Sequence, residues 1–456
     1  MKPPNILFIS TDELRFDTLG YAGDSIVRTP HIDSLEKDSV QFENAYCPSP
    51  ICIPSRQCMA MGSYPRTCGV EVFGQDLEPN SHTFARAFSL AGYNTVACGK
   101  LHHVGEDPNQ GWMRRIGMDE QVHRSTINVA RGTEDPFPVV QNKWTDRKEI
   151  RRAGVGMSPY TRWDELATLG AEFLLEEYFV SPFYERRYTE QPLMLYLGLC
   201  NPHYPYAAEE DLFNYYYDRV DPNYVASVFD HPVLGKSAYN DGEPVTVGEG
   251  QQVSRDEIRR ATAAYYANIE ALDARVGRVI QSIKASGQDI DDWIVVFCSD
   301  HGELLGEHSV WEKQLFFEGS ARVPLFIRCP WHCEGRSVRS NVNLIDLYAT
   351  LGELTGVECP EGMESRSLVP LMSGDHSQWD NQVCSQMHGK YIMIKRDSLK
   401  YLHFGGDGMD VLFDLDRDPS ESENFINETE YADAVASMRD ELVTYGFEHK
   451  PFCATK

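Results

Sequence analysis

Four short apolar runs along the chain each end in a cluster of polar residues. The runs are residues 6–9, 95–98, 193–199 and 293–298. The polar clusters that follow them are residues 11–13, 99–102, 201–203 and 299–303. Runs this apolar are typical of strands buried on both faces of a parallel sheet. Because ligands gather beyond the carboxyl ends of such strands, the pattern predicts one shared site at this edge.

A long helical pattern precedes the last of these runs. Ser254 and Glu257 fit a capping box, and apolar residues recur at helical spacing from Ile258 to Ile283 before Gly287. A shorter predicted helix, about residues 83–91, precedes the run at 95–98. Strands that alternate with helices predict an α/β fold, with a mostly parallel sheet flanked by helices.

The pattern changes after about Ser365. The strands predicted in this part are residues 391–395, 399–403 and 410–415. A last helix, about residues 428–445, is expected to pack on them. This predicts a smaller C-terminal antiparallel sheet with a helix. We therefore expect a catalytic α/β domain over residues 1–365 and a C-terminal α+β subdomain over residues 366–456.

Two long stretches interrupt the alternation, residues 104–162 and 202–250, and both are rich in turn-forming or charged residues. Long loops inside a compact domain are uncommon unless they serve a function. We expect these two stretches to form the walls of the site.

Charge narrows the classes of partner. The 456 residues include 42 Lys and Arg against 69 Asp and Glu, a formal net charge of −27. Such a surface disfavours nucleic acid and anionic membranes. No apolar run approaches the roughly 20 residues of a membrane span. The apolar run near the N-terminus is shorter than a secretory segment, so we expect a cytoplasmic protein. The sequence does not indicate an oligomeric state.

Twelve cysteines are too few for a disulfide scaffold, and reduced thiols are the expectation for a cytoplasmic protein. Four of them lie close together in the chain: Cys47, Cys52, Cys58 and Cys68. Their spacing lacks the paired form of a zinc knuckle, which disfavours a zinc site. Most of the cysteines are expected to be small core residues.

The sharpest local motif is Cys52-Ile53-Pro54-Ser55-Arg56. Proline suits a first helical position, which would place Cys52 at a helix N-terminus that favours anions. Arg56 adds a fixed cation. Taken alone, the motif fits either an activated thiol nucleophile or a buried structural cysteine before a helix.

The motif resembles the signature of the formylglycine-dependent sulfatases, in the alkaline phosphatase superfamily. In that family the cysteine is oxidised after translation to formylglycine, whose hydrate is the nucleophile. Other family segments follow in order, and they cover nearly the whole chain. These segments are Asp12 after the first run, Gly-Lys-Leu-His at 99–102, Pro-His-Tyr-Pro at 202–205, Ser-Asp-His-Gly-Glu at 299–303, Lys313, and Leu-Phe-Asp-Leu at 412–415. The resemblance implies an alkaline-phosphatase-like fold.

The resemblance also implies one divalent cation. Its ligands would be Asp12, Asp300, His301 and the formylglycine made from Cys52. Carboxylates with one imidazole suit a hard or borderline cation. Calcium is the leading choice, and His301, where many sulfatases have Asn, makes manganese plausible. Whether Glu13 is also a ligand stays open at this point.

Catalytic roles follow from the same resemblance. Lys100 and Lys313 would stabilise charge on the sulfate oxygens, and Arg56 would favour the ionised nucleophile. His203, with Lys313, would protonate the departing alcohol. His102 would take a proton from the second hydroxyl and release sulfate. A gem-diol is needed because a serine or cysteine would leave a stable ester. Maturation implies a formylglycine-generating enzyme as a partner.

Three functions remain for comparison. The first is a sulfuric ester hydrolase that acts on a small or chain-end carbohydrate sulfate or an aryl sulfate. The second is a phosphonate monoester or phosphodiester hydrolase of the same superfamily. The third is a non-catalytic metal-holding protein whose Cys52 stays a thiol. The sequence favours the first and does not specify the sulfated alcohol.

Overall fold

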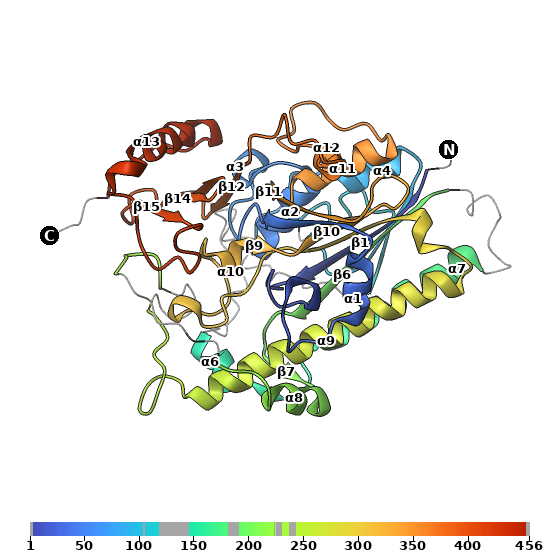
Figure 1. Ribbon diagram of the computed structural model, residues 1–456. Helices are drawn as coiled ribbons and strands as arrows, with labels where there is room; N and C mark the ends of the chain where they lie inside the picture. Colours follow the sequence, from blue (N-terminus) through green and yellow to red (C-terminus); the bar gives the residue numbers. More distant parts are fainter. Residues whose placement is uncertain are drawn as a thin grey trace.

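The computed structural model describes residues 3–103, 105–117, 146–180, 191–222, 224, 230–236 and 243–452. A large sheet crosses the centre of the molecule (Figure 1). Its strand order is β11-β2-β10-β8-β1-β6-β3-β4, with β9 beside β2. Its strands are β1 (Asn5–Asp12), β2 (Val40–Tyr46), β3 (Asn94–Gly99), β4 (Arg114–Ile116), β6 (Leu193–Pro202), β8 (Trp293–Ser299), β9 (Arg322–Val323), β10 (Leu325–Arg328) and β11 (Arg336–Asn343).

The four predicted apolar runs are four neighbouring strands, in the order β8-β1-β6-β3. All three pairings between them are parallel, and Ile9 of β1 stands opposite Leu197 on one side and Phe297 on the other. Because the strands are parallel, their polar carboxyl ends lie at one edge of the sheet. The antiparallel strand β10 beside β8 makes the sheet mixed. The predicted mostly parallel sheet is confirmed.

Helices cover both faces of the sheet, as Figure 1 shows. They are α1 (Pro30–Glu36), α2 (Cys52–Met61), α3 (Pro65–Cys68), α4 (Phe84–Leu90), α6 (Asp146–Arg151), α7 (Pro159–Phe179), α8 (Glu210–Tyr217), α9 (Arg255–Ala285), α10 (Glu318–Ala321), α11 (Asp346–Thr355), α12 (Val369–Met372) and α13 (Ala432–Glu441). The sheet has a hydrophobic core on each face, and successive residues of β1 point to opposite cores. Leu7 and Ile9 pack with α1, α7 and α9, whereas Ile6 and Phe8 pack with α2, α4 and α11.

The capping residues explain where the two predicted helices begin. The Ser254 hydroxyl accepts the Glu257 N–H of α9, and the Glu257 carboxylate accepts the Ser254 N–H, which completes the capping box. The Thr83 side chain caps α4 by accepting the Arg86 N–H. Both predicted helices are therefore confirmed to within their end residues. The 21-residue helix α7 was not predicted, and its first four residues lie inside the stretch assigned to a loop.

The long stretches contain more structure than the sequence suggested. In the described part they hold β4, α6, the start of α7, α8 and the short parallel pair β5 (Gly154–Val155) and β7 (Ala207–Ala208). Residues 104, 118–145, 223, 225–229 and 237–242 of these stretches lie outside the described residues. That the stretches form the walls of the site stays a prediction.

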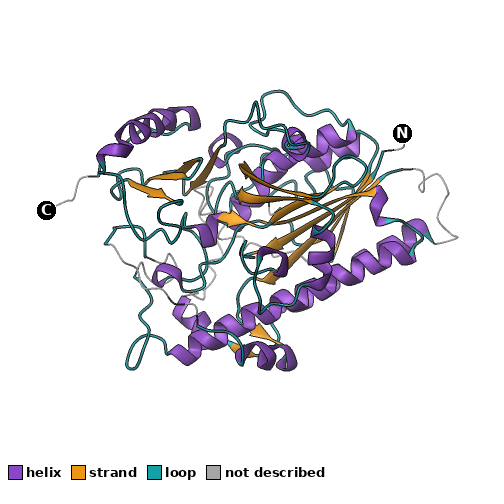
Figure 2. Ribbon diagram, in the orientation of Figure 1, coloured by secondary structure: helices purple, strands orange, loops and turns teal. Residues whose placement is uncertain are grey.

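The C-terminal part forms a separate antiparallel sheet with α13 above it (Figure 2). Its strands are β12 (Gln382–Met387), β13 (Tyr391–Arg396), β14 (Leu399–His403) and β15 (Val411–Asp414). Three of them were predicted, and β12 was not. The predicted helix is divided into 3-10 turns at 429–431 and 442–445 around α13. The domain boundary after residue 365 stays a prediction. Helix α12 follows that boundary in the chain, but it packs in the core of the large sheet.

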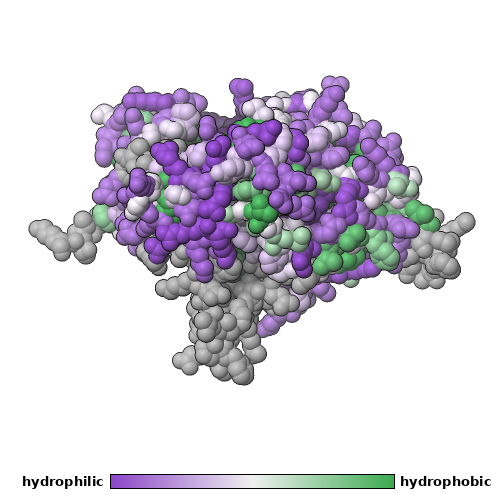
Figure 3. Space-filling model, turned by 90° about the horizontal axis from the view of Figure 1, so that it is seen from below, coloured by the Kyte–Doolittle hydropathy of each residue, from purple (hydrophilic) through white to green (hydrophobic). Residues whose placement is uncertain are grey.

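The surface is largely hydrophilic in the view from below, with a hydrophobic patch on the side where α7 runs (Figure 3). Helix α7 has three large apolar side chains that are exposed: Leu166, Leu169 and Phe173. Of the helices in the described ranges, none combines the length and apolar character that crossing a membrane requires.

Candidate active site

Three segments meet at the carboxyl edge of the large sheet. Asp12 ends β1, Asp300 and His301 follow β8, and Cys52 is the first residue of α2. The potential ligand atoms of these four residues all lie within 4.8 Å of one another, and all four residues are buried. Residues that are far apart in the chain thus form one compact group, because β1 and β8 are parallel neighbours and α2 points its N-terminus at their ends.

The Cys52 thiol lies at the centre of this group. Its Sγ atom is 3.1 Å from Nε2 of His301 and 3.8 Å from Oδ1 of Asp12. Helix α2 begins at Cys52, so Pro54 is its third residue and not the first, as the sequence had suggested. Burial raises the pKa of the thiol well above its ordinary value, and Asp12 adds to the rise although Lys313 and Lys100 oppose it. An unmodified Cys52 is therefore a protonated thiol.

Arg56 connects the two carboxylates of the group. Its Nε atom lies 2.7 Å from Asp300 Oδ2, and its Nη2 atom lies 3.3 Å from Asp12 Oδ2. The other guanidinium hydrogens go to the carbonyl oxygens of Thr11 and Lys100 and to the Tyr196 hydroxyl. Every arm of the guanidinium is engaged within the protein. Arg56 thus acts on the site by fixing Asp12 and Asp300.

Lys100 follows β3 and reaches back to β1. Its ammonium lies 2.7 Å from Asp12 Oδ2, and both side chains are fully buried. Burial by itself would raise the pKa of Asp12, but nearby cations, Lys100 foremost, hold that pKa well below its ordinary value. Asp12 is therefore an ionised carboxylate that can bind a cation.

His203 and Lys313 form a second group beside the first. The Lys313 ammonium lies 2.7 Å from Nε2 of His203 and 3.1 Å from Oε2 of Glu13. Nδ1 of His203 is 2.6 Å from the Tyr204 carbonyl oxygen. Since a carbonyl only accepts, Nδ1 carries hydrogen and Nε2 accepts from Lys313.

Glu13 belongs to this second group. Its Oε2 atom faces Lys313 and His203, and it is not one of the four residues around Cys52. Burial raises the pKa of Glu13 well above its ordinary value, although Lys313 opposes the rise. Its Oε1 atom is buried and has no hydrogen-bond partner among the described residues. In this geometry Glu13 is a partner of Lys313.

His102 is held by α2 through its backbone. The Gln57 side-chain amide donates to the His102 carbonyl at 2.8 Å, and Arg56 donates to the carbonyl of Lys100 on the same segment. The His102 ring is buried and meets Phe73 edge to face at 6.0 Å. Helix α2 therefore positions the whole segment that carries Lys100 and His102.

The donor atoms suit a divalent cation. Nδ1 of His301 lies 2.9 Å from the Gly302 carbonyl oxygen, so that nitrogen carries hydrogen and Nε2 keeps its lone pair for a metal. The Asp12 and Asp300 oxygens lie on the same side. Two carboxylates, one imidazole and the atom at residue 52 are a set that hard or borderline cations accept.

Two tyrosines that the sequence did not single out border the site. Lys100 lies 5.4 Å from the ring centre of Tyr160, and Lys313 lies 4.7 Å from that of Tyr204. His203 also meets Tyr160 edge to face at 5.3 Å. Tyr204 could have been suspected from its place beside His203, whereas nothing local marked Tyr160, which α7 brings in.

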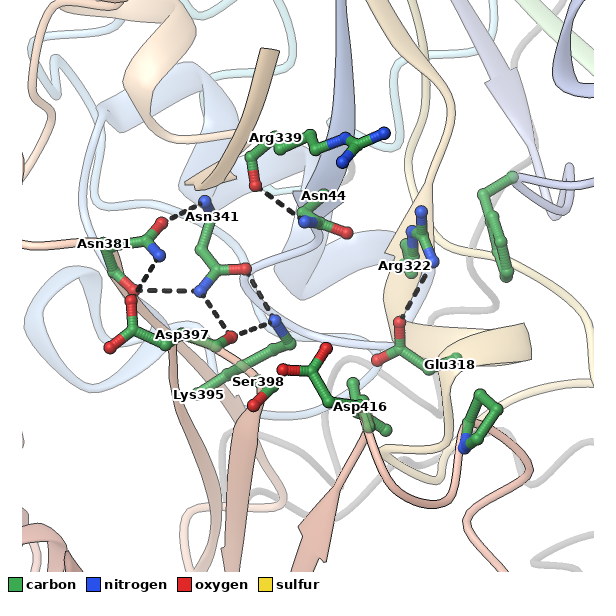
Figure 4. A pocket seen from close by; sticks show the side chains of 13 residues that line it. Asn44, Glu318, Arg322, Arg339, Asn341, Asn381, Lys395, Asp397, Ser398 and Asp416 are labelled. Carbon is green, nitrogen blue, oxygen red and sulfur yellow. Dashed lines mark hydrogen bonds and ion pairs between the residues drawn. The ribbon is translucent and has the colours of Figure 1, made fainter. Parts of the chain in front are cut away.

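A separate polar pocket of about 500 Å³ lies between the large and small sheets (Figure 4). Lys395 donates there to the Asn341 side chain and to the Asp397 carbonyl, and Arg322 pairs with Glu318 on one side of the pocket. None of the predicted site residues lines it. The candidate active site is therefore the buried group around Cys52.

Comparison with known proteins identifies a family that this chain matches. Residues 4–357 match the sulfatase family model, and residues 306–446 match the model described as N-sulphoglucosamine sulphohydrolase, C-terminal. An arylsulfatase of Clostridium perfringens is 28% identical, over 96% of this chain and 94% of the relative. A choline-sulfatase of Rhizobium meliloti is 29% identical, over 92% of this chain and 82% of the relative.

Solved structures show the same fold. A structure in complex with its substrate D-glucosamine-2-N,6-O-disulfate gives a TM-score of 0.75 at 19% identity and covers 97% of both chains. The phosphonate monoester hydrolase of Agrobacterium radiobacter gives 0.73 at 23% identity, over 97% of this chain and 95% of that one. Because the sulfatase model matches most of the chain, the protein belongs to the sulfatase family of the alkaline phosphatase superfamily and is an enzyme that hydrolyses sulfate esters.

Proposed function

We propose that this sulfatase cleaves a small or chain-end carbohydrate sulfate, or an aryl sulfate, at a formylglycine made from Cys52. The observation that carries the proposal is the position of Cys52, whose Sγ atom lies 3.1 Å from Nε2 of His301, within a buried group that includes Asp12 and Asp300. A sulfate held there would lie among cations that can neutralise it.

A chemical argument supports conversion of Cys52. Burial keeps the thiol protonated, which makes it a poor nucleophile. A formylglycine at residue 52 would supply two geminal hydroxyls, one to attack sulfur and one to release sulfate. The core pattern of Cys52, Pro54 and Arg56 is what a formylglycine-generating enzyme would read, so we propose that enzyme as a maturation partner. Cytoplasmic location likewise stays a proposal.

One divalent cation would be held by Asp12, Asp300, His301 and residue 52. When bound, it would supply positive charge to a sulfate oxygen and to the nucleophilic oxygen. Oxygen donors dominate the set, which supports calcium, and the His301 imidazole keeps manganese as the second choice. Arg56 would fix the two carboxylates at their spacing.

The chain's own side chains divide the remaining work. Lys100 and Lys313 would face the non-bridging sulfate oxygens, where charge develops in the transition state. Lys313, hydrogen-bonded to His203, would deliver the proton that the departing alcohol needs. His102 would accept the proton of the second hydroxyl.

Two aromatic rings beside the site support a ring-bearing substrate. Tyr160 and Tyr204 lie beside Lys100 and Lys313, so the leaving group would depart next to two aromatic rings. Such rings pack on sugars or aryl groups. The name arylsulfatase of one relative and the disulfated glucosamine in one similar structure are compatible with this range, whereas choline, in the name of another relative, has no ring.

Two measurements test the proposal. Peptide mass spectrometry across residue 52, after expression with a formylglycine-generating enzyme, should show the aldehyde, and Cys52→Ala should abolish turnover. Rates on an aryl sulfate and on phenyl phosphonate should favour the sulfate. The second function, phosphonate monoester hydrolysis, is kept because a phosphonate monoester hydrolase has this fold. Dominant phosphonate turnover would establish it, and a persistent thiol would favour a metal-holding protein.

A further inference from the structure

A pair of thiols lies at the other end of the helix that carries Cys52. Cys58, two residues after Arg56 on α2, has its Sγ atom 3.2 Å from Sγ of Cys68 on α3. This separation is about 1 Å longer than a disulfide bond. Cys58 is fully buried and Cys68 is half-buried. Nothing in the proposed catalytic steps uses either thiol.

The backbone between the two cysteines holds them together. Gly62 ends α2 in the left-handed region, at φ 68°, and its N–H donates to the Cys58 carbonyl at 2.8 Å. A side chain at Gly62 would come within 3.1 Å of Ser365 and of Tyr348. The turn therefore needs glycine, and it returns the chain so that α3 packs on α2. The contact between the thiols is a consequence of this turn.

The grouping of the four clustered cysteines also changes in three dimensions. Cys52 faces Asp12 and His301, whereas Cys58 packs in the core of the small sheet with Tyr64 and Cys384. Among the described residues, no group of potential metal ligands includes Cys58 or Cys68. Cys58 and Cys68 are therefore a pair that is separate from Cys52.

We propose that Cys58 and Cys68 are a disulfide-forming site that a small-molecule disulfide closes. Cys68 is the accessible partner, so its thiolate attacks one sulfur of glutathione disulfide and releases one glutathione. Cys58 then loses its proton and attacks Sγ of Cys68, which releases the second glutathione. Two cysteine thiols and one glutathione disulfide thus give one protein disulfide and two glutathiones.

Burial supports this order of events. It raises the pKa of the Cys58 thiol well above its ordinary value, with Cys68 adding to the rise. A buried, protonated thiol is a poor first nucleophile but is well placed to resolve a mixed disulfide 3.2 Å away. The bond would fasten the last turn of α2 to α3 and leave the first turn, with Cys52 and Arg56, untouched.

The test uses the folded full-length protein. After incubation with glutathione disulfide and alkylation of free thiols, peptide mapping should find residues 58 and 68 in one linked pair that dithiothreitol separates. Closing a loop of this length should raise the midpoint of thermal unfolding by about 3 °C. Cys58→Ala and Cys68→Ser should each lose both the linked peptide and the shift.

The matched control is Cys359→Ser. Cys359 is also half-buried, and its thiol donates to the carbonyl oxygens of Tyr348 and Val357. This variant should keep the linked pair and the thermal shift. The proposal is overturned if both thiols of the wild-type protein stay free during oxidation and are then alkylated, or if either one is found linked to another cysteine. Mapping of the wild type decides this even if a variant fails to fold.

Discussion

Lys313 donates a hydrogen bond to His203, with 2.7 Å between Nζ and Nε2. The Tyr204 carbonyl fixes hydrogen on the other ring nitrogen, so the shared proton belongs to Lys313. From the sequence, His203 was expected to protonate the departing alcohol as the general acid, with Lys313 assisting it. The geometry favours the reverse assignment, in which His203 orients the ammonium and Lys313 delivers the proton.

Removal of this proton donor should lower kcat/KM most for substrates with poor leaving groups. Lys313→Met should lower kcat/KM by about 10²- to 10⁴-fold for a sugar sulfate, and by much less for nitrophenyl sulfate, whose phenolate departs unprotonated. The measurement is a series of aryl sulfates of increasing phenol pKa. Lys390→Met, at an exposed ion pair with Asp407, is the control and should change nothing. An equal loss across the series would refute the role in proton transfer.

Substitution of Arg56 should lower the stability of the fold and the affinity of the site for its cation, as well as turnover. Arg56→Met leaves Asp12 and Asp300 buried without their shared counter-ion, so the free energy of unfolding should fall by about 3 to 5 kcal/mol. Cation affinity should fall by about 10- to 100-fold, because the carboxylates lose their support. Urea unfolding and cation titration measure the two effects. Arg417→Met, at an exposed ion pair, should leave both unchanged.

Removal of the cation should abolish activity reversibly. Treatment with a chelator should take away turnover, and added Ca²⁺ should restore it, with Mn²⁺ next. His301→Asn should shift the preference further towards Ca²⁺, because an amide oxygen replaces the imidazole. Activity and thermal stability are measured after each ion is added back. Full activity in the chelator would contradict a metal-dependent site.

Asp164 should make stability depend on pH. Its buried carboxylate accepts the N–H groups of Cys200 (2.6 Å) and Asn201 (2.9 Å), just before His203. Burial raises its pKa to about 6, despite the nearby Arg275. The folded protein therefore holds this proton more tightly than the unfolded chain does. The stabilisation is complete below about pH 4 and is lost as the pH rises through 6, about 3 kcal/mol in all.

Urea unfolding between pH 4 and 7 measures this slope, and Asp164→Asn should flatten it. The variant should be less stable at low pH, since an amide cannot accept both N–H groups as the carboxyl does. Asp211→Asn is the control, because Asp211 is an exposed residue of α8. A slope that survives in Asp164→Asn would assign it to another group.

Net charge should select against long polyanions. The whole chain carries a formal net charge of −27, whereas the cations Lys100 and Lys313 lie buried. We expect faster turnover of small or chain-end sulfates than of interior sulfates in a heavily sulfated polymer, with the difference shrinking as salt screens the repulsion. Rates on both substrates from low to high ionic strength measure it. Equal rates at low salt would show that the net charge has no such effect.

The sequence by itself determined the four parallel strands β8, β1, β6 and β3 and the residue types at their ends. Runs such as residues 293–298 are apolar on every position, and only a strand buried on both faces explains them. The order of the motifs also determined the family and the grouping of Asp12, Cys52, Asp300 and His301. Such features are local, because periodicity and motif spacing are written in consecutive residues.

Tertiary structure alone decided how those residues are used. The chain separates Glu13 from Lys313 by 300 residues, and only the meeting of distant segments makes them partners. Arg56 could have faced the substrate, but buried carboxylates on two neighbouring strands require a shared counter-ion. Helix α7, the source of Tyr160, and the contact between Cys58 and Cys68 were likewise settled by packing. Side-chain partners across a core depend on which surfaces meet, and no local pattern records that.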